Sequence, residues 1–251
     1  MTPGDIFSTT PEVWPYARVF GDYYKKFTKP LPKTDLNSEI GPKIDAIFVF
    51  NDPRDWGLDI QIIVDVLLSS QGVIGTKSNK NNRTDLPNRG FQQDGQPPLY
   101  FSNPDMVWPA AYHLPRLGQG AFREALDGVW AAVTGGPNKG VELKKTVIGK
   151  PSHTTYEYAE RQLIRNRIKY FGEQDKLPLK KVYMVGDNPE SDIRGANSYR
   201  SCNGTDWHSI LVRTGVYNGG EPEWVPRTIA DNVQKAVEYG LQSCKWPISK
   251  V

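Results

Sequence analysis

Two turns of this 251-residue chain carry charged side chains of the kind that handle phosphate and metal ions. Asp187 follows an apolar run over residues 182–185, and Asp192 comes five residues later, at the start of a predicted short helix. Carboxylates at the carboxyl ends of strands in an open α/β sheet line the crevice where ligands bind. They suit Mg²⁺, which takes one or two protein carboxylates and completes its shell with water and phosphate. The alternative is that Asp187 caps the helix and Asp192 is solvated.

The second turn contains Lys150, between Gly149 and Pro151 and just before another predicted helix. A lysine there can meet phosphate as a point charge, beside the helix dipole and the free N–H groups of the first turn. A surface turn is the alternative interpretation of these three residues taken alone. Because one turn offers a cation and the other a pair of carboxylates, the two together predict a magnesium and phosphate site.

Alternating strands and helices are predicted to position these turns. Short apolar, β-branched runs indicate strands at 45–50, 98–101, 181–185 and 209–215, and a strand followed by a turn within 146–151. Helical periodicity indicates helices at 56–69, from about 120 to the glycines at 135–136, at 154–169, near 193–196 and at 225–242. Thr154 and Glu157 have the offset of a capping box. Phe122, Leu126, Val129, Trp130 and Val133 are predicted to share one helix face, and Ile229, Val233, Ala236, Val237 and Leu241 another. This order is typical of an α/β fold with a parallel sheet.

Composition narrows the possible functions. Lys and Arg number 31 and Asp and Glu 28, a net charge of +3 spread along the chain, which argues against a nucleic-acid or membrane-surface role. Two cysteines, Cys202 and Cys244, form no disulfide framework, so we expect an intracellular, reducing compartment. The apolar runs are far shorter than the ~20 residues of a transmembrane helix. The first residues do not resemble a targeting peptide.

Longer motifs resemble a known family. Residues 148–152 and 182–197 resemble the third and fourth motifs of haloacid-dehalogenase-type (HAD) hydrolases of subfamily IIA. Residues 48–56, 101–105, 115–123 and 207–217 are similar to the cat-eye-syndrome critical region protein 5-like family of these hydrolases. The resemblance covers nearly the whole chain. It implies a partial HAD-like, Rossmann-type core with a parallel sheet and an α/β C2-type cap domain.

The resemblance also implies domains and roles. We expect a connecting segment or core remnant at 1–41, the cap at 42–145, and the C-terminal half of the core at 146–251. By resemblance, Asp187 binds Mg²⁺ with support from Asp192, and Lys150 neutralises the phosphoryl group and the nucleophile. Asn103 and Asp105, on a cap loop, face the substrate and help to select it. An Asx turn after a strand is the alternative for these two residues.

One feature of the family is missing. HAD chemistry starts from a DxD motif, in which one aspartate attacks phosphorus and the next acts as general acid and base. No DxD occurs in this chain, and Asp52 and Asp55 have the wrong spacing. The second motif, a phosphate-binding Ser or Thr, is absent as well. We therefore expect no nucleophile, weak or absent Mg²⁺ binding, no magnesium-dependent phosphatase activity from the chain alone, and a strand at 182–185 that lacks a neighbour.

Two functions follow. The first is a HAD-type, phosphatase-like hydrolase that performs Mg²⁺-dependent phosphoryl transfer on a small phosphorylated substrate in its full-length form, and is inactive in this truncated chain. The second is a non-catalytic protein that binds a partner or a phosphorylated ligand through the cap and Lys150. Resemblance alone adds a link to glycerophospholipid metabolism and to mitochondria. Neither the substrate nor the oligomeric state can be predicted from these residues.

Overall fold

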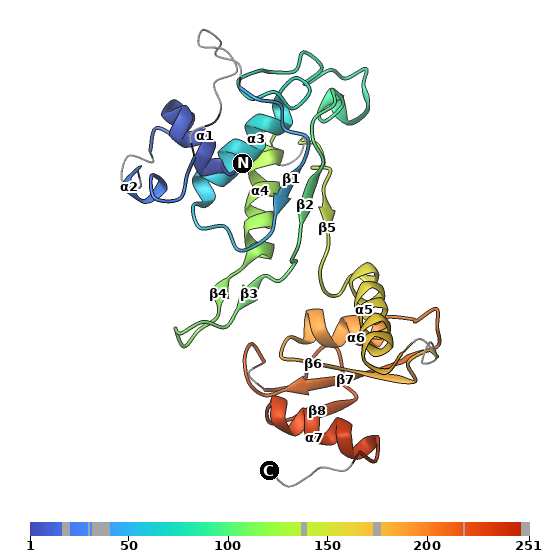
Figure 1. Ribbon diagram of the computed structural model, residues 1–251. Coiled ribbons are helices and arrows are strands. Elements are labelled where there is room, and N and C mark those ends of the chain that lie inside the picture. Colours follow the sequence, from blue (N-terminus) through green and yellow to red (C-terminus); the bar gives the residue numbers. More distant parts are fainter. Residues whose placement is uncertain are drawn as a thin grey trace. The chain divides into compact units, whose positions relative to one another are not determined.

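The computed structural model describes residues 1–16, 21–29, 31, 41–136, 140–172, 177–217 and 219–246. Their contacts form two compact units (Figure 1). The first contains Met1–Ser102 and Ala121–Val147, and the second contains Asn103–Gly120 and Ile148–Val251. Each unit has its own parallel sheet, which confirms the predicted α/β class. Of the helices that the structure describes, none is both long enough and apolar enough to cross a membrane.

The first unit is built on a three-stranded parallel sheet. The strands predicted at 45–50, at 98–101 and within 146–151 are present as β1 (Ile47–Val49), β2 (Leu99–Phe101) and β5 (Thr146–Val147), in that spatial order. They are short because turn residues follow each of them, such as Asn51 to Pro53 after β1.

Two helices cover one face of this sheet. They are α3 (Trp56–Leu68) and α4 (Gln119–Val133), and both contribute to one core. The fully buried side chains of this core include Leu67, Phe101, Phe122, Leu126 and Trp130. The prediction that Val129 and Val133 share the buried face is wrong, since they are 41% and 52% exposed. The buried stripe of α4 is centred on Leu126 and Trp130, so both valines lie at its rim.

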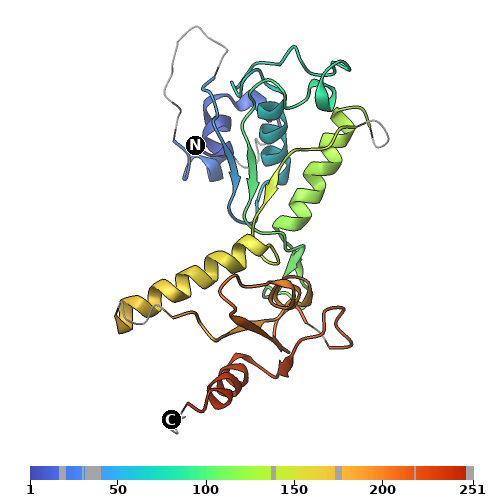
Figure 2. The same cartoon turned by 90° about the vertical axis from the view of Figure 1, so that its right-hand side faces the viewer.

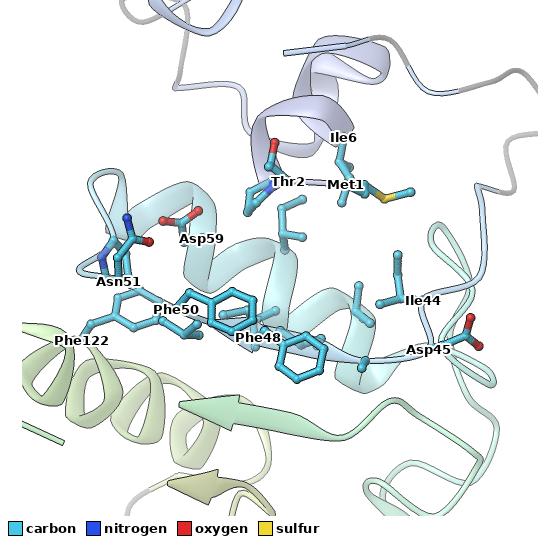
Figure 3. A pocket seen from close by; sticks show the side chains of 18 of the residues that line it. Met1, Thr2, Ile6, Ile44, Asp45, Phe48, Phe50, Asn51, Asp59 and Phe122 are labelled. Atoms are coloured by element: carbon cyan, nitrogen blue, oxygen red, sulfur yellow. The ribbon is translucent and has the colours of Figure 1, made fainter. Parts of the chain in front are cut away.

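The opposite face of the sheet carries exposed aromatic rings. Phe48 stacks on Phe50 and on Tyr100, with ring centroids 5.3 and 5.1 Å apart. A cavity of ≈ 730 Å³ opens at the edge of the same sheet, between β1, α3 and the first residues of the chain (Figure 3).

The N-terminal residues belong to the packed structure of the first unit. Helix α1 (Pro3–Thr9) begins with a capping box between Thr2 and Asp5, and Ile6 and Phe7 are buried against α3. A short helix, α2 (Gly21–Tyr24), follows a 3₁₀ turn at Pro11–Val13. The first residues thus form a capped helix with a core to pack against, and the expectation of a connecting segment or core remnant over residues 1–41 stays a prediction. Residues 17–20, 30 and 32–40 lie outside the described residues.

The long polar stretch between α3 and β2 is irregular, apart from a short turn at Pro87–Gly90. Polar contacts hold it together. The carboxylate of Asp94 accepts hydrogen bonds from Ser70 and Ser78 and forms an ion pair with Lys80 at 3.0 Å.

The second unit has a parallel sheet of β6 (Lys181–Gly186), β7 (Asp206–Val212) and β8 (Thr228–Ala230), in that order. Within the described residues, β6 pairs only with β7, so it is an edge strand, as predicted for residues 182–185. The prediction of one helix over 225–242 is wrong. Its first part forms β8, and α7 (Val233–Ser243) begins after Asn232, whose side chain accepts a hydrogen bond from the backbone N–H of Lys235 at 3.0 Å.

Helices cover both faces of this second sheet (Figure 2). On one face, α5 (His153–Phe171) and α6 (Arg194–Ser198) pack over Trp207 and its neighbours. On the other, α7 packs over Ile210 and Val212 through Ala236. Val233 and Val237 are 56% and 50% exposed and Ile229 is on β8, so the predicted apolar face of this helix is reduced mainly to Ala236.

The predicted capping box of α5 is also wrong. The cap residue is Ser152, whose side chain makes no capping hydrogen bond. Thr155 instead accepts a hydrogen bond from the N–H of Gly149 at 3.1 Å, which ties the first turn of α5 back to the Lys150 turn.

A hairpin that was not predicted changes the boundary between the units. Strands β3 (Val107–Trp108) and β4 (Arg116–Leu117) pair antiparallel, and its base is closed by N–H groups of Gly118 and Gly120 that donate to Met106 and Asp105. The segment Asn103–Gly120 has its contacts in the second unit. This division differs from the predicted cap at 42–145, since the hairpin segment is grouped with the later half of the chain.

Candidate functional site

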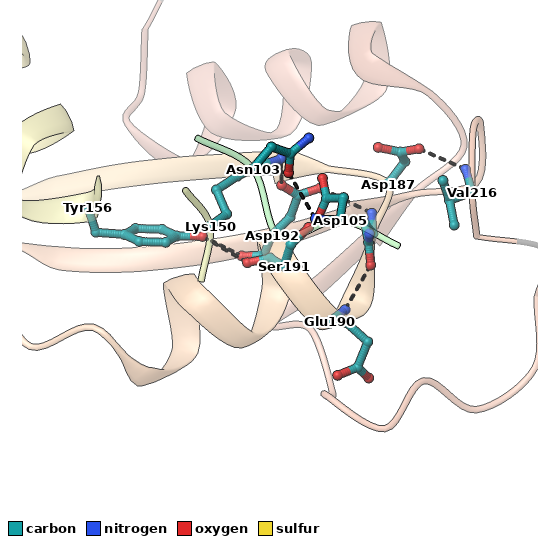
Figure 4. A network of polar contacts seen from close by, with 10 residues as sticks. Asn103, Asp105, Lys150, Tyr156, Asp187, Glu190, Ser191, Asp192 and Val216 are labelled. Atoms are coloured by element: carbon teal, nitrogen blue, oxygen red, sulfur yellow. Dashed lines mark hydrogen bonds and ion pairs between the residues drawn. The ribbon is translucent and has the colours of Figure 1, made fainter. Parts of the chain in front are cut away.

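Lys150 and Asp192 form the centre of the site in the second unit (Figure 4). Lys150 lies in the turn between β5 and α5, and Asp192 lies on a π-helical turn, Pro189–Ile193, that follows β6. The Nζ of Lys150 is 2.5 Å from Oδ1 of Asp192, and Oδ2 accepts the N–H of Asn188 at 3.1 Å. The side chain of Asp192 is 2% exposed and that of Lys150 is 37% exposed. The lysine is thus the member of the pair that a ligand can reach.

Gly186 makes room for this carboxylate. A Cβ at Gly186 would lie 2.2 Å from the Asp192 side chain, so only glycine lets the end of β6 pass so closely. The close packing of Asp192 therefore explains why a glycine precedes Asp187 in the sequence motif.

Tyr156 holds the turn that carries Asp192. It is buried on α5, and its hydroxyl donates to the backbone carbonyls of Ser191 and Asp192 at 3.2 and 3.0 Å. Burial raises the pKa of Tyr156, and the charge of Asp192 raises it further, so the hydroxyl remains a donor. Sequence reasoning missed Tyr156, because it was six residues beyond Lys150 with no motif around it.

Glu160 fixes α5 in turn. This carboxylate is 1% exposed, and Ser201, Asn203 and Thr205 donate to its Oε1 at 2.7 to 3.0 Å. The indole N–H of Trp207 donates to Oε2 at 3.0 Å. Burial works against the charged form, but these hydrogen bonds outweigh it and lower the pKa of Glu160. The helix that bears Tyr156 is thereby attached to the start of β7.

Asp187 is held from the loop that follows β7. Its Oδ2 accepts the N–H of Val216 at 2.7 Å. Gly215, at φ +106°, allows this approach, since a Cβ there would lie 2.0 Å from that oxygen. Among the described residues, no hydrogen bond reaches Oδ1 of Asp187. One carboxylate oxygen is therefore available for a cation.

Asp105 faces the same group of charges. Burial raises the pKa of Asp105, while Lys150 and the Ser191 hydroxyl act to lower it. Asp192 and Asp187 add repulsion, so the three carboxylates are close enough to sense one another. The structure thus brings together four of the five predicted site residues: Asp105, Lys150, Asp187 and Asp192.

Asn103 has a different position. Its side-chain oxygen accepts the N–H of Asp105 at 2.9 Å, which is the Asx turn considered as the alternative. Its own N–H donates to the side chain of Gln119 at 2.9 Å. Asn103 therefore shapes the turn that presents Asp105, and its predicted contact with a substrate stays a prediction.

The charges of the site decide what can bind there. The hydrogen bond and charge of Asp192 outweigh the effect of burial and raise the pKa of Lys150, which stays protonated at neutral pH. One cation and three carboxylates leave the site net negative. A phosphate therefore needs a second cation to bind.

The carboxylate oxygens of the site could provide some, but not all, of the ligands of a Mg²⁺ ion. Both oxygens of Asp192 are occupied, so Asp187 and Asp105 remain as ligands. In the part of the chain that the structure describes, no three His, Cys, Asp or Glu side chains are arranged to enclose a metal ion. Two carboxylates suit a cation that keeps its waters and shares a phosphate oxygen, as Mg²⁺ does, better than one that needs a closed cage.

Comparisons with known proteins give a consistent family. Residues 147–236, which contain Lys150 and both acidic-turn aspartates, match the family described as HAD-hydrolase-like. A cardiolipin synthase (CMP-forming)/mitochondrial hydrolase fusion protein of Schizosaccharomyces pombe is 41% identical over 91% of this chain. A mitochondrial hydrolase of Saccharomyces cerevisiae is 35% identical over 95% of it. The chain spans 33% of the length of the first relative and 65% of the second.

Among solved structures, a possible sugar phosphatase of the HAD superfamily from Cytophaga hutchinsonii aligns with a TM-score of 0.43 and 18% identity. That alignment covers 84% of this chain and 58% of the other. The family match and the two relatives support the predicted resemblance at the level of the superfamily: residues 147–236 match haloacid-dehalogenase (HAD)-like hydrolases, and most of the chain is similar to two longer proteins whose names contain the words mitochondrial hydrolase.

Proposed function

We propose that the second unit binds a small phosphorylated ligand together with Mg²⁺, and that in a complete HAD hydrolase of the subfamily IIA type this site serves phosphomonoester hydrolysis. The observation that carries the proposal is the position of Lys150 among Asp105, Asp187 and Asp192. These residues lie on two turns that each follow a strand and open a helix, plus one loop. Asp187 and Asp192 follow the carboxyl end of β6, the place where ligands bind in open α/β sheets.

Each residue then has a defined task. Lys150 donates a charge-assisted hydrogen bond to a phosphoryl oxygen, and Asp192 orients its ammonium group. Asp187 offers Oδ1 to the metal while Val216 fixes its other oxygen. Asp105, presented by the Asn103 turn, would help to select the ligand. Bound Mg²⁺ would neutralise the phosphoryl oxygens and offset the negative charge of the three carboxylates.

The sequence lacks the aspartate nucleophile that attacks phosphorus in HAD hydrolases. No DxD motif occurs in these 251 residues. Asp55, which with Asp52 forms the pair most similar to a DxD motif, is in the first unit. There it caps α3 and accepts a hydrogen bond from the hydroxyl of Tyr24 at 2.5 Å. Without a nucleophile, a covalent mechanism loses most of its rate enhancement. We therefore propose that this chain by itself binds phosphate but does not turn over a phosphomonoester.

The second candidate is a non-catalytic protein that uses the same site for a phosphorylated ligand or a partner. One observation favours a connection to glycerophospholipid metabolism: the relative from S. pombe joins a cardiolipin synthase to a mitochondrial hydrolase. Both relatives carry the word mitochondrial in their names, so we propose a mitochondrial location for this protein too.

Calorimetric titration with inorganic phosphate tests the proposed site. Binding should require Mg²⁺ and should be lost in Asp187→Asn and Lys150→Gln. Asp231→Asn is the control, because Asp231 is 82% exposed and pairs only loosely with Arg213, at 3.7 Å. Phosphate binding that is equal with and without Mg²⁺ would contradict the proposal.

A turnover assay with p-nitrophenyl phosphate tests the second part. No magnesium-dependent product should form above the rate of the Asp187→Ala variant. Clear turnover by the unmodified chain that disappears in Asp187→Ala would show that a nucleophile is present after all.

A further inference from the structure

The first unit contains a groove that has the features of a binding site. None of the residues of the proposed phosphate site lines it. The cavity of ≈ 730 Å³ is lined by apolar side chains of α1, β1 and α3, including Ile6, Ile62 and Val66. A second cavity of ≈ 720 Å³ shares Thr2, Pro3, Asn51, Pro53 and Asp59 with it. The two cavities therefore adjoin at these residues, and we refer to them together as the groove; each is within the usual size of a ligand pocket.

The free edge of β1 forms one wall of this groove. Among the described strands, β1 pairs only with β2. The N–H of Ile47 donates to Pro98, and the carbonyl of Val49 accepts the N–H of Ser102, so these two residues face β2. Because backbone groups alternate in direction along a strand, the N–H and C=O of Phe48 face the other way. They can pair with an added strand.

Asp59 supplies a charge at the junction of the two cavities. It is on the first turn of α3 and lies between Thr2 and the end of β1 (Figure 3). No described residue forms a hydrogen bond or an ion pair with its carboxylate. Burial, with repulsion from Asp55, raises the pKa of Asp59 to about 6, so at neutral pH it is a charged group without compensation. A half-buried, unpaired carboxylate favours a cationic ligand group.

These features select one kind of occupant. A second copy of this chain could offer its own β1, but residues 44–51 contain no lysine or arginine and would leave Asp59 unpaired. A small apolar molecule would leave the backbone groups of Phe48 unpaired as well. An extended peptide with apolar side chains and one basic side chain satisfies the edge, the apolar lining and the carboxylate together.

We propose that the groove binds an extended segment of a partner polypeptide as a strand added to β1, with apolar side chains between α1 and α3 and one lysine or arginine paired with Asp59. Main-chain hydrogen bonds to Phe48 would provide affinity, and the apolar lining and the carboxylate would provide selectivity.

The test uses the full chain and a probe peptide of seven residues, capped at both ends, made of valine and threonine with one central lysine. Fluorescence anisotropy should show saturable binding. Replacement of the lysine by norleucine should weaken binding at least fivefold, and Asp59→Asn should weaken the lysine peptide to a similar extent. The norleucine peptide should bind Asp59→Asn and the unmodified chain equally.

Two controls separate strand addition from general stickiness. Asp65→Asn should leave binding unchanged, since Asp65 is on the same helix, does not line the groove and already accepts a hydrogen bond from Gln61 at 2.8 Å. A peptide with alternate amides N-methylated should not bind, because it cannot pair with β1. No binding at millimolar peptide, equal binding of the N-methylated peptide, or a dimer that the peptide does not dissociate would each overturn the proposal.

Discussion

Removal of the positive charge at Lys150 should destabilise the second unit as well as the ligand site. The variant Lys150→Met leaves the carboxylate of Asp192 charged at 2% exposure, with the N–H of Asn188 as its remaining partner. Breaking a buried ion pair costs about 3–5 kcal/mol. Because Lys150 is 37% exposed and water reaches it, we expect about 2–3 kcal/mol.

A double-mutant cycle isolates the interaction. Asp192→Asn alone removes the charge-assisted bond, and the double variant Lys150→Met with Asp192→Asn leaves no unpaired buried charge. The double variant should therefore be more stable than the sum of the single costs predicts, by about 1.5–3 kcal/mol. Amide hydrogen exchange of β6 and β7 is the suitable assay, because it reports the second unit separately in a chain of two units.

Additive costs would refute this reasoning. So would a loss of less than about 0.5 kcal/mol in Lys150→Met, the level of an exposed ion pair. Either result would mean that Asp192 is as well solvated without the lysine as with it, and the local geometry of the site would then need another explanation.

Three further predictions concern other buried or crowded groups. Glu160→Gln should destabilise the second unit by about 2–4 kcal/mol at pH 7, since an amide cannot accept from all four donors. The pKa of Glu160 is lowered on folding, so the stabilisation that its carboxylate provides should be lost as the pH falls below about 4. Acid titrations followed by circular dichroism measure this loss. Asp59→Asn should stabilise the first unit by about 1–2 kcal/mol at pH 7.5, because folding raises the pKa of Asp59 to about 6 and penalises the charged form. Urea titrations at pH 7.5 and at about pH 3 should show the gain vanish at the lower pH, where Asp59 is largely protonated in both the folded and the unfolded state. Gly215→Ala should weaken magnesium-dependent phosphate binding at least tenfold in calorimetry, because its Cβ would displace Asp187, whereas Gly204→Ala, where the added Cβ would meet no neighbouring atom, should leave it unchanged.

The elements themselves were largely predictable. Strands β1, β2, β6 and β7 and helices α3 and α5 could be predicted from apolar runs and helical periodicity, because each is bounded by turn residues that act locally. The strands missed were β3, β4 and β8, which are two or three residues long. Such short strands exist only because a partner strand is present, and the local pattern does not record the partner.

The charged residues of the candidate site could be predicted from the sequence, but the buried residues that hold them in place could not. Lys150, Asp187 and Asp192 stood out because a cation and two carboxylates follow apolar strands and precede helices. Tyr156 and Glu160 did not, since their partners are 35 to 47 residues away and their roles depend on burial. Roles for Asn103 and Asp105 were predicted alike, but backbone geometry separates them into a turn former and a group that faces the charges.

The sequence by itself therefore determined the fold class, the two charged turns and the absence of a DxD motif, because these depend on residue types and on spacing along the chain. Only the tertiary structure decided that the segment Asn103–Gly120 joins the second unit, that Asp192 supports Lys150, and that β1 and Asp59 border an open groove. The physical reason is that burial, hydrogen-bond satisfaction and a free sheet edge are properties of contacts between residues distant in sequence.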